Sequence, residues 1–206
     1  MIHPHTRLVF IDEEIGYGVF ATQFIPKGTI TYVKDSLELE ISPRQFSSYP
    51  PVLQQAIDKY SYIDERGMRI VSWDLGKYVN HCCHCNTLST GYGFEIAIRD
   101  IHPGEEITDE YGLFNIETSM EVHCKWPDCR RRICKEDLER LYPVWDEQVR
   151  QALAHCLEVE QPLQPLIDPS TWRMVEQFLV DPSQYLSVSH LRYDPSKFNG
   201  ENVAIE

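Results

Sequence analysis

The stretch Tyr78-Val79-Asn80-His81-Cys82-Cys83-His84-Cys85-Asn86 carries the densest chemistry of this 206-residue chain. An adjacent Asn and His offer paired hydrogen-bond donors and acceptors, and the neighbouring thiols offer soft metal ligands. A second stretch, Pro103-Gly104-Glu105-Glu106-Ile107-Thr108-Asp109-Glu110-Tyr111-Gly112, reads as a strand that ends on a tyrosine beside a glycine. A third, Gly16-Tyr17-Gly18, opens a strand, and its glycines let the backbone approach a ligand closely. Taken singly, these are also typical of a β-turn or a buried tyrosine.

The order of the motifs resembles that of the SET-domain protein-lysine methyltransferases. In that family a Gly-x-Gly is followed by Pro-Lys-Gly, then Asn-His-x-Cys-x-x-Asn, then Pro-Gly-Glu-Glu-hydrophobic-Thr-x-x-Tyr-Gly. This chain has Pro26-Lys27-Gly28 in the second place, and the resemblance covers about Thr6 to Asn115, with a partial match as far as Cys129. The chain departs from the pattern at Cys82 and Cys85, where Ser and Pro are common, and at Asp109, where Phe or Tyr is frequent.

The resemblance implies transfer of methyl groups from S-adenosyl-L-methionine to a lysine side chain of a protein substrate. It also implies a mainly β fold with α-helices, in which small sheets are threaded through a pseudo-knot and the Asn-His segment lies beside the tyrosine-bearing one. Tyr111 is then the catalytic tyrosine. The residues that the resemblance assigns to cofactor binding are Gly16, Tyr17, Gly18, Lys77, Asn80, His81 and Tyr111.

These residue types suit the implied reaction. Methyl transfer from a sulfonium is an in-line displacement, so alignment supplies much of the catalysis. A lysine ammonium has no lone pair, and a dry channel lowers its pKa by disfavouring the charged form. Tyr111 is expected to orient the amine or the methyl group rather than to act as an obligate base, because a phenol is mostly protonated at neutral pH. Asp109 is expected to point into the channel and to influence how many methyl groups are added.

The cysteines allow two interpretations. Many members of the family bind zinc with the Asn-His-x-Cys cysteine and a following Cys-x-Cys-x4-Cys, and here Cys83, Cys124 and Cys129 match that pattern. Val122 replaces the first cysteine of the trio, so the fourth ligand of a tetrahedral site is missing from the pattern. The candidates to complete it are Cys134, Cys85, His123 and His84. The alternative is a set of free, partly buried thiols.

The hydrophobic pattern predicts three regions. Short β-like runs indicate a catalytic domain over residues 4–115, interrupted by a helical insert at about 42–60. Residues 116–135 form a cysteine segment of the kind that follows the SET domain in relatives. Helical spacing then indicates an α-helical C-terminal extension over residues 136–206, ending in a flexible tail. The apolar positions expected to face the catalytic domain are Leu138, Leu141, Leu153, Trp172, Val175 and Phe178.

The charge balance restricts the partners. The chain has 19 basic and 32 acidic residues, a net charge of −13. Such a field repels phosphate backbones and favours a basic, lysine-containing protein or peptide, so direct nucleic-acid binding is disfavoured. No apolar run approaches the ~20 residues of a membrane span, and the start lacks a secretory signal. An intracellular protein, cytoplasmic or nuclear, is therefore expected.

Two other classes of function compete with the enzyme. One is a catalytically inactive SET-like module that acts as a protein-interaction or zinc-binding adaptor. The other is a thiol hydrolase that pairs His81 or His84 with a nearby cysteine. This last reading is disfavoured, because adjacent residues rarely point at one another and no oxyanion motif is visible.

Overall fold

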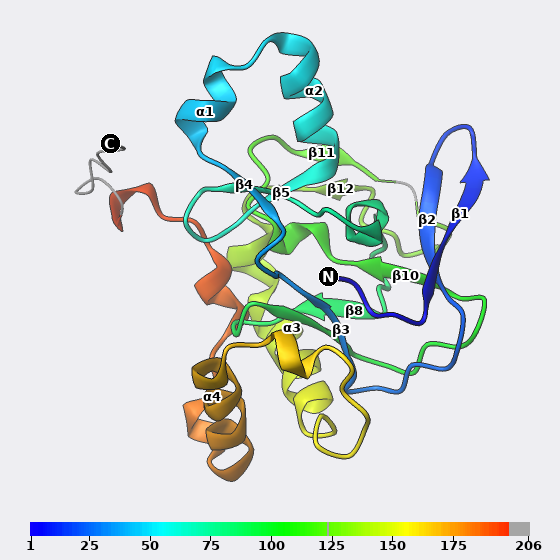
Figure 1. The fold of residues 1–206 in the computed structure, drawn as a ribbon, viewed down its shortest axis with the longest axis vertical. Coiled ribbons are helices and arrows are strands. Elements are labelled where there is room, and N and C mark those ends of the chain that lie inside the picture. The colour runs from blue at the N-terminus through cyan, green and yellow to red at the C-terminus, as the bar shows by residue number, and fades with distance from the viewer. Residues whose placement is uncertain (123, 198–206) are drawn as a thin grey trace.

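The β part of the protein consists of small sheets, in a computed structural model that describes residues 1–122 and 124–197 (Figure 1). The strands are β1 (Thr6–Asp12), β2 (Gly16–Ala21), β3 (Ile30–Val33), β4 (Leu39–Ile41), β5 (Ser61–Ile63), β6 (Arg69–Val71), β7 (Asn80–His81), β8 (Thr87–Ser89), β9 (Phe94–Ala97), β10 (Glu106–Asp109), β11 (Met120–Glu121) and β12 (Arg132–Ile133). They pair in the orders β1-β2-β10-β7, β3-β9-β8, β4-β6-β5 and β11-β12. The expected fold of small sheets with helices is confirmed.

The helical insert consists of α1 (Pro43–Ser48) and α2 (Pro51–Tyr60), at the top of Figure 1. Ser42 starts α1 with a capping box: its hydroxyl accepts from the Gln45 amide, and the Gln45 side chain accepts from the Ser42 amide. Of the apolar positions in α2, Ile57 is buried, whereas Val52 is 74% exposed. The insert then leads into β5 and β6, which form one wall of the cavity described below.

The C-terminal helices α3 (Asp137–Leu153) and α4 (Pro169–Val180) share one hydrophobic core with the sheet β3-β9-β8. Trp145 of α3 and Val175 of α4 belong to the same cluster of buried side chains as Ile30 and Ile96. Of the positions expected to face the catalytic part, those that are buried are Leu138, Leu153, Val175 and Phe178, and those that are partly buried and pack against the cluster are Leu141 and Trp172. The extension is thus part of the main core rather than a detachable lid.

The decisive pairing lies at the edge of the four-stranded sheet, where β7 runs parallel to β10. Thr108 lies opposite Asn80, and Asp109 lies opposite His81. The Asn86 side chain extends this contact: its Oδ1 accepts from the Thr108 amide at 2.9 Å, and its Nδ2 donates to the Glu106 carbonyl at 2.8 Å. The Asn-His segment therefore lies directly beside the segment that leads to Tyr111.

The end of β10 differs from the sequence prediction, and part of the predicted tail lies outside the residues that the structure describes. Strand β10 ends at Asp109, and Tyr111 begins a short 3-10 helix, η2 (Tyr111–Leu113), so strand alternation does not relate these two side chains. The tail expected to be flexible lies partly outside the described residues. No helix in the described ranges is long and apolar enough to cross a membrane.

Candidate active site

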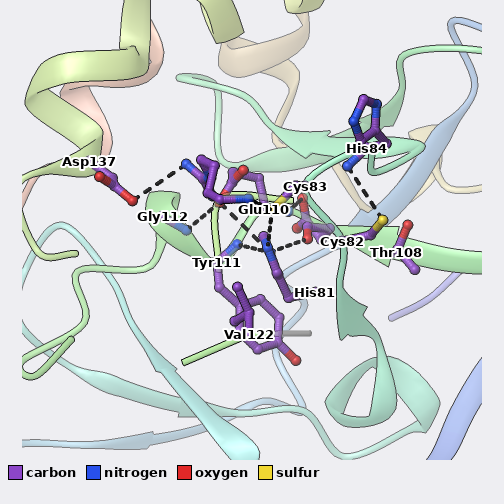
Figure 2. A network of polar contacts seen from close by, with 12 residues as sticks. His81, Cys82, Cys83, His84, Thr108, Glu110, Tyr111, Gly112, Val122 and Asp137 are labelled. Atoms are coloured by element: carbon purple, nitrogen blue, oxygen red, sulfur yellow. Dashed lines mark hydrogen bonds and ion pairs between the residues drawn. The ribbon is translucent and has the colours of Figure 1, made fainter. Parts of the chain in front are cut away.

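His81 and Tyr111 meet where β7 passes β10 (Figure 2). Their ring centroids are 5.5 Å apart, and His81 Nδ1 lies 3.1 Å from the Asp109 carbonyl oxygen. Burial, followed by the charge of Arg130, lowers the pKa of His81 to about 4, so the imidazole is neutral at physiological pH. In the tautomer protonated at Nδ1, it donates to the Asp109 carbonyl and links the two crossing segments.

The Tyr111 hydroxyl is held by one hydrogen bond, which it donates to the Val79 carbonyl oxygen at 2.7 Å. Its proton is therefore committed to the protein, while the lone pairs of the oxygen remain able to accept a hydrogen bond. Burial raises the pKa of Tyr111, and the charges of Asp109 and Glu95 raise it further. The hydroxyl stays protonated and cannot serve as a base near neutral pH.

Asn80 anchors the glycine segment. Its Nδ2 donates to the Tyr17 carbonyl at 3.0 Å and to Glu106 Oε1 at 2.8 Å. A Cβ on Gly18 would lie only 2.6 Å from the same Glu106 oxygen and 3.1 Å from Asn80 Nδ2, so a larger residue there would displace the Glu106 carboxylate that Asn80 binds. Both donors of the Asn80 amide are thus used within the protein, and its backbone pairs with β10, which leaves its Oδ1 for a ligand.

The other residues assigned to cofactor binding are arranged around this anchor. Gly16 has a φ of +84° and open space on its Cβ side, and Tyr17 is 48% exposed. The Tyr17 ring packs edge-on against Tyr78, 6.1 Å between centroids. Lys77 lies in η1 (Leu75–Tyr78); its Nζ is 3.4 Å from the Ser72 carbonyl oxygen, and the residue lines the same cavity as Tyr111. Gly16, Tyr17, Gly18 and Asn80 therefore lie together, and Lys77 contacts this group through Tyr78, with its Nζ 5.5 Å from the centroid of that ring.

A cavity of about 640 Å³ opens beside Tyr111. One wall comes from the end of α2 and from β5, which contains Tyr62. Another comes from Phe114, whose ring centroid lies 5.2 Å from that of Tyr62 and 5.5 Å from that of Tyr111. Asp109 and Glu95 complete the wall next to the tyrosine. Asp109 thus faces the cavity, as expected, although the strand ends at this residue.

Glu95 is the site residue that the sequence did not single out. The alternation of Phe94, Glu95 and Ile96 along β9 buries the two apolar residues in the core and turns Glu95 to the opposite face. Burial raises the pKa of Glu95 to about 7. Burial of Asp109 and the nearby charge of Glu95 hold the pKa of Asp109 well above its usual value. The sequence signal that could have identified Glu95 is an acidic residue between two apolar residues on the central strand of its sheet.

The three cysteines expected to bind metal come together. The sulfur atoms of Cys83, Cys124 and Cys129 all lie within 4.8 Å of one another, and the Cys83 and Cys129 sulfurs are 3.8 Å apart. Tetrahedral zinc with Zn–S bonds of ~2.3 Å requires sulfurs about 3.8 Å apart, so the spacing fits. Burial raises the pKa of Cys129, but hydrogen bonds from Cys124 and the Arg131 amide outweigh burial and lower this pKa to about 7. The lowered pKa favours a thiolate ligand.

The fourth ligand is not supplied by the candidates that the structure describes. Within residues 1–122 and 124–197, neither Cys134, Cys85 nor His84 joins the group of three. His84 instead lies with its Nε2 2.9 Å from Asp128 Oδ1 and packs against the Trp126 ring at 4.7 Å. His123, the remaining candidate, lies outside the described residues.

Arg130, one of several basic residues that follow Cys124, contacts acidic residues of the protein body. Arg130 Nη2 lies 2.6 Å from Glu110 Oε1, and its Nη1 lies 3.4 Å from Asp137 Oδ2 at the start of α3. The same Glu110 oxygen accepts from the Gly112 amide at 2.9 Å and so shapes the turn that follows Tyr111. Figure 2 labels Glu110, Gly112 and Asp137, which belong to this network.

Comparison with known proteins matches the same part of the chain. Residues 16–112 match the family model described as the SET domain, a range that contains all four motifs. The chain is also similar to the variant-silencing SET domain-containing protein of Plasmodium falciparum (isolate 3D7), with 32% identity over 135 residues, 57% of this chain. That alignment covers 5% of the Plasmodium protein, so the chain spans about a twentieth of the length of this relative.

Proposed function

Because residues 16–112 of this chain belong to the SET-domain family, we propose that the protein transfers methyl groups from S-adenosyl-L-methionine to a lysine side chain of a protein substrate. The observation that carries the proposal is the meeting of two segments far apart in sequence. The Asn80-His81 strand lies beside the segment leading to Tyr111, and the Tyr111 side chain lines a cavity large enough for a side chain.

The cofactor side of this proposal rests on Gly16, Tyr17, Gly18, Asn80 and His81. The open backbone at Gly16 and the exposed ring of Tyr17 suit a ligand that approaches the chain closely, and Asn80 holds that segment in place. When bound, S-adenosylmethionine supplies a methyl group on a positively charged sulfur. His81 contributes by joining β7 to β10 through the Asp109 carbonyl rather than by proton transfer, because it is neutral and buried.

The lysine side of the proposal rests on Tyr111 and the cavity. The Tyr111 hydroxyl donates to Val79, so its oxygen is oriented to accept a hydrogen bond from an amine or a polarised methyl group. The rings of Tyr62, Phe114 and Tyr111 exclude water from the aliphatic part of a lysine. A lysine ammonium has no lone pair, so the side chain must lose a proton before it attacks the methyl group.

The Cys83, Cys124 and Cys129 group supports zinc as a structural element of the same proposal. Its sulfur spacing fits a tetrahedral ion, and the ion would tie the cysteine segment to the Asn-His segment. The net charge of −13 favours a basic, lysine-containing protein or peptide as the substrate and speeds its encounter with the enzyme.

The proposal is tested by cofactor binding and turnover measured separately. Calorimetry with S-adenosylmethionine should detect binding, and incubation with labelled cofactor and a cell lysate should place label on lysines, read by mass spectrometry. Tyr111→Phe is the matched control, since it removes one hydroxyl and should abolish most of the labelling while binding persists. Binding without any transfer by the wild-type protein would instead favour the non-catalytic adaptor, and absence of binding would refute the proposal.

A further inference from the structure

The wall of the cavity nearest Tyr111 carries two carboxyl groups from different sheets. Asp109 is the last residue of β10, and Glu95 lies in the middle of β9. Both line the cavity that also contains the rings of Tyr62, Tyr111 and Phe114. Two carboxyl groups beside these aromatic rings call for an explanation, because burying a carboxylate without a partner costs several kcal/mol.

The two carboxyl oxygens of Asp109 differ in their hydrogen bonding. Asp109 is 1% exposed, and its Oδ1 accepts a hydrogen bond from the Glu110 amide at 2.7 Å. Its Oδ2 is buried, and the donor available to it among the described residues is the neighbouring Glu95 carboxyl group when that group is protonated. When both carboxyl groups are ionised, this buried acceptor in the cavity wall needs a donor that enters the cavity.

Three basic residues line the cavity, Lys59, Arg69 and Lys77, and no ion pair among the described residues joins one of them to Asp109 or Glu95. The Nζ of Lys59 lies over the Tyr60 ring, 5.2 Å from its centroid. Arg69 lies 2.8 Å from Asp58 and also pairs with Glu117, and the Nζ of Lys77 lies near backbone carbonyls. The N-terminal ammonium lies 2.9 Å from Asp35. Within the described ranges, neither Asp109 nor Glu95 has an ion pair with a lysine or an arginine, so their negative charge is available to a ligand.

We propose that Asp109 and Glu95 form an anionic subsite that binds the ammonium group of the side chain entering the cavity. This inference rests on the proposed function in one respect, that the entering side chain is a lysine. The buried Oδ2 of Asp109 accepts a hydrogen bond from the ammonium, and Glu95 contributes charge from the neighbouring strand. The three rings surround the methylene groups and attract the cation through their faces.

The charge state of the pair agrees with this role. Burial disfavours ionisation of both carboxyl groups. Glu95 raises the pKa of Asp109 further, whereas the hydrogen bond with Asp109 lowers that of Glu95, so the pair keeps its proton on Asp109 when the cavity is empty. An ammonium ion reverses that balance because opposite charges at close range favour the ionised acid. The subsite therefore discriminates a cation from a neutral side chain of the same length.

The subsite is tested with n-pentylammonium, an analogue of the lysine side chain, and with 1-pentanol as its neutral counterpart. Titration of the whole chain, followed by NMR, should show that the wild type binds the ammonium more tightly than the alcohol. Asp109→Asn and Glu95→Gln should each weaken ammonium binding at least about tenfold, the effect of losing a hydrogen bond to a charged group. Neither change should alter binding of the alcohol. Glu121→Gln is the matched control, since it removes the same charge from an exposed position on β11 outside the cavity.

Equal binding of the ammonium to the wild type and to both variants would overturn the subsite, as would equal binding of ammonium and alcohol to the wild type. Because two different variants are tested, a folding defect in one of them does not decide the outcome. Urea unfolding of each variant shows whether it has such a defect. The outcome is separable from the proposed function. Selective ammonium binding in a protein that neither binds S-adenosylmethionine nor transfers methyl groups would support the subsite and refute the proposed enzyme. Methyl transfer without selective ammonium binding would support the enzyme and refute the subsite.

Discussion

Replacement of Asn80 by alanine tests whether this side chain holds the glycine segment in place. The substitution removes the hydrogen bond to the Tyr17 carbonyl at 3.0 Å and the one to the Glu106 carboxylate at 2.8 Å. A neutral bond contributes about 1 kcal/mol to stability and a charged one about 1.5–3 kcal/mol, before water replaces part of each at this partly exposed position. We expect the free energy of unfolding in urea to fall by about 2 kcal/mol.

The assay pairs stability with cofactor affinity. Asn80→Ala should also weaken S-adenosylmethionine binding in calorimetry by ~1–3 kcal/mol, because Gly16 and Tyr17 lose the anchor that fixes their backbone. Glu106→Gln is the conservative control, since it keeps an acceptor for the Asn80 amide. A double-mutant cycle of Asn80→Ala with Glu106→Ala should give a coupling of about 1 kcal/mol. An unfolding free energy within about 0.5 kcal/mol of the wild type and no measurable coupling would refute the anchoring role.

Four further outcomes follow from the site and the core. Tyr111→Phe should lower methyl transfer by about 10²-fold with little change in S-adenosylmethionine affinity, as measured by labelled turnover and calorimetry, because the hydroxyl acts mainly in the transition state. Cys129→Ser should abolish stoichiometric zinc, measured by elemental analysis, because it removes a thiolate from the group of three. Trp145→Ala should lower the free energy of unfolding in urea by about 3–5 kcal/mol, because it empties a 5%-exposed site in the core shared by α3 and the sheet. Asp109→Phe should shift the ratio of mono-, di- and trimethyl products in peptide mass spectrometry, because a ring replaces a carboxyl group in the cavity wall.

Each of these has a result that would count against it. Wild-type turnover in Tyr111→Phe would make the tyrosine a packing residue. Full zinc content in Cys129→Ser would place the metal elsewhere, and unchanged stability in Trp145→Ala would mean that α3 is dispensable for the core. Identical product ratios for Asp109→Phe at matched turnover would show that Asp109 does not limit methylation.

Much of the fold was accessible from the sequence because its signals are local. Ser followed by Pro, as at Ser42-Pro43, is typical of a helix start, and a capping box is found there. Pro-Lys-Gly at 26–28 and Pro-Gly at 103–104 are typical of turns, and Gly28 and Gly104 have φ values of +91° and +82°, which glycine adopts without steric cost. Alternation over 94–98 is typical of a strand with Phe94 and Ile96 on one face, and both are buried.

The chemistry of the cavity was harder to predict because it depends on contacts between distant segments. Alternation along β9 shows that Glu95 faces away from the core, but only the packing of the insert turns that face into the wall of a cavity. The position of Tyr111 likewise depends on Glu110, whose carboxylate accepts from the Gly112 amide and starts a 3-10 turn where the sequence suggested that the strand continues. Neither effect leaves a periodic signal in the sequence.

One carboxylate joins the turn that follows Tyr111 to the cysteine segment and to the helix α3. Glu110 Oε1 accepts from the Gly112 amide and from Arg130, and Arg130 in turn reaches Asp137 at the start of α3. The Arg130 amide also donates to Cys83 Sγ at 3.4 Å. Any change in the packing or ligation of the cysteines therefore acts on the residue that orients the turn after Tyr111. Zinc content and turnover should consequently change together in variants of this network, even though none of its members touches the cavity except through Tyr111.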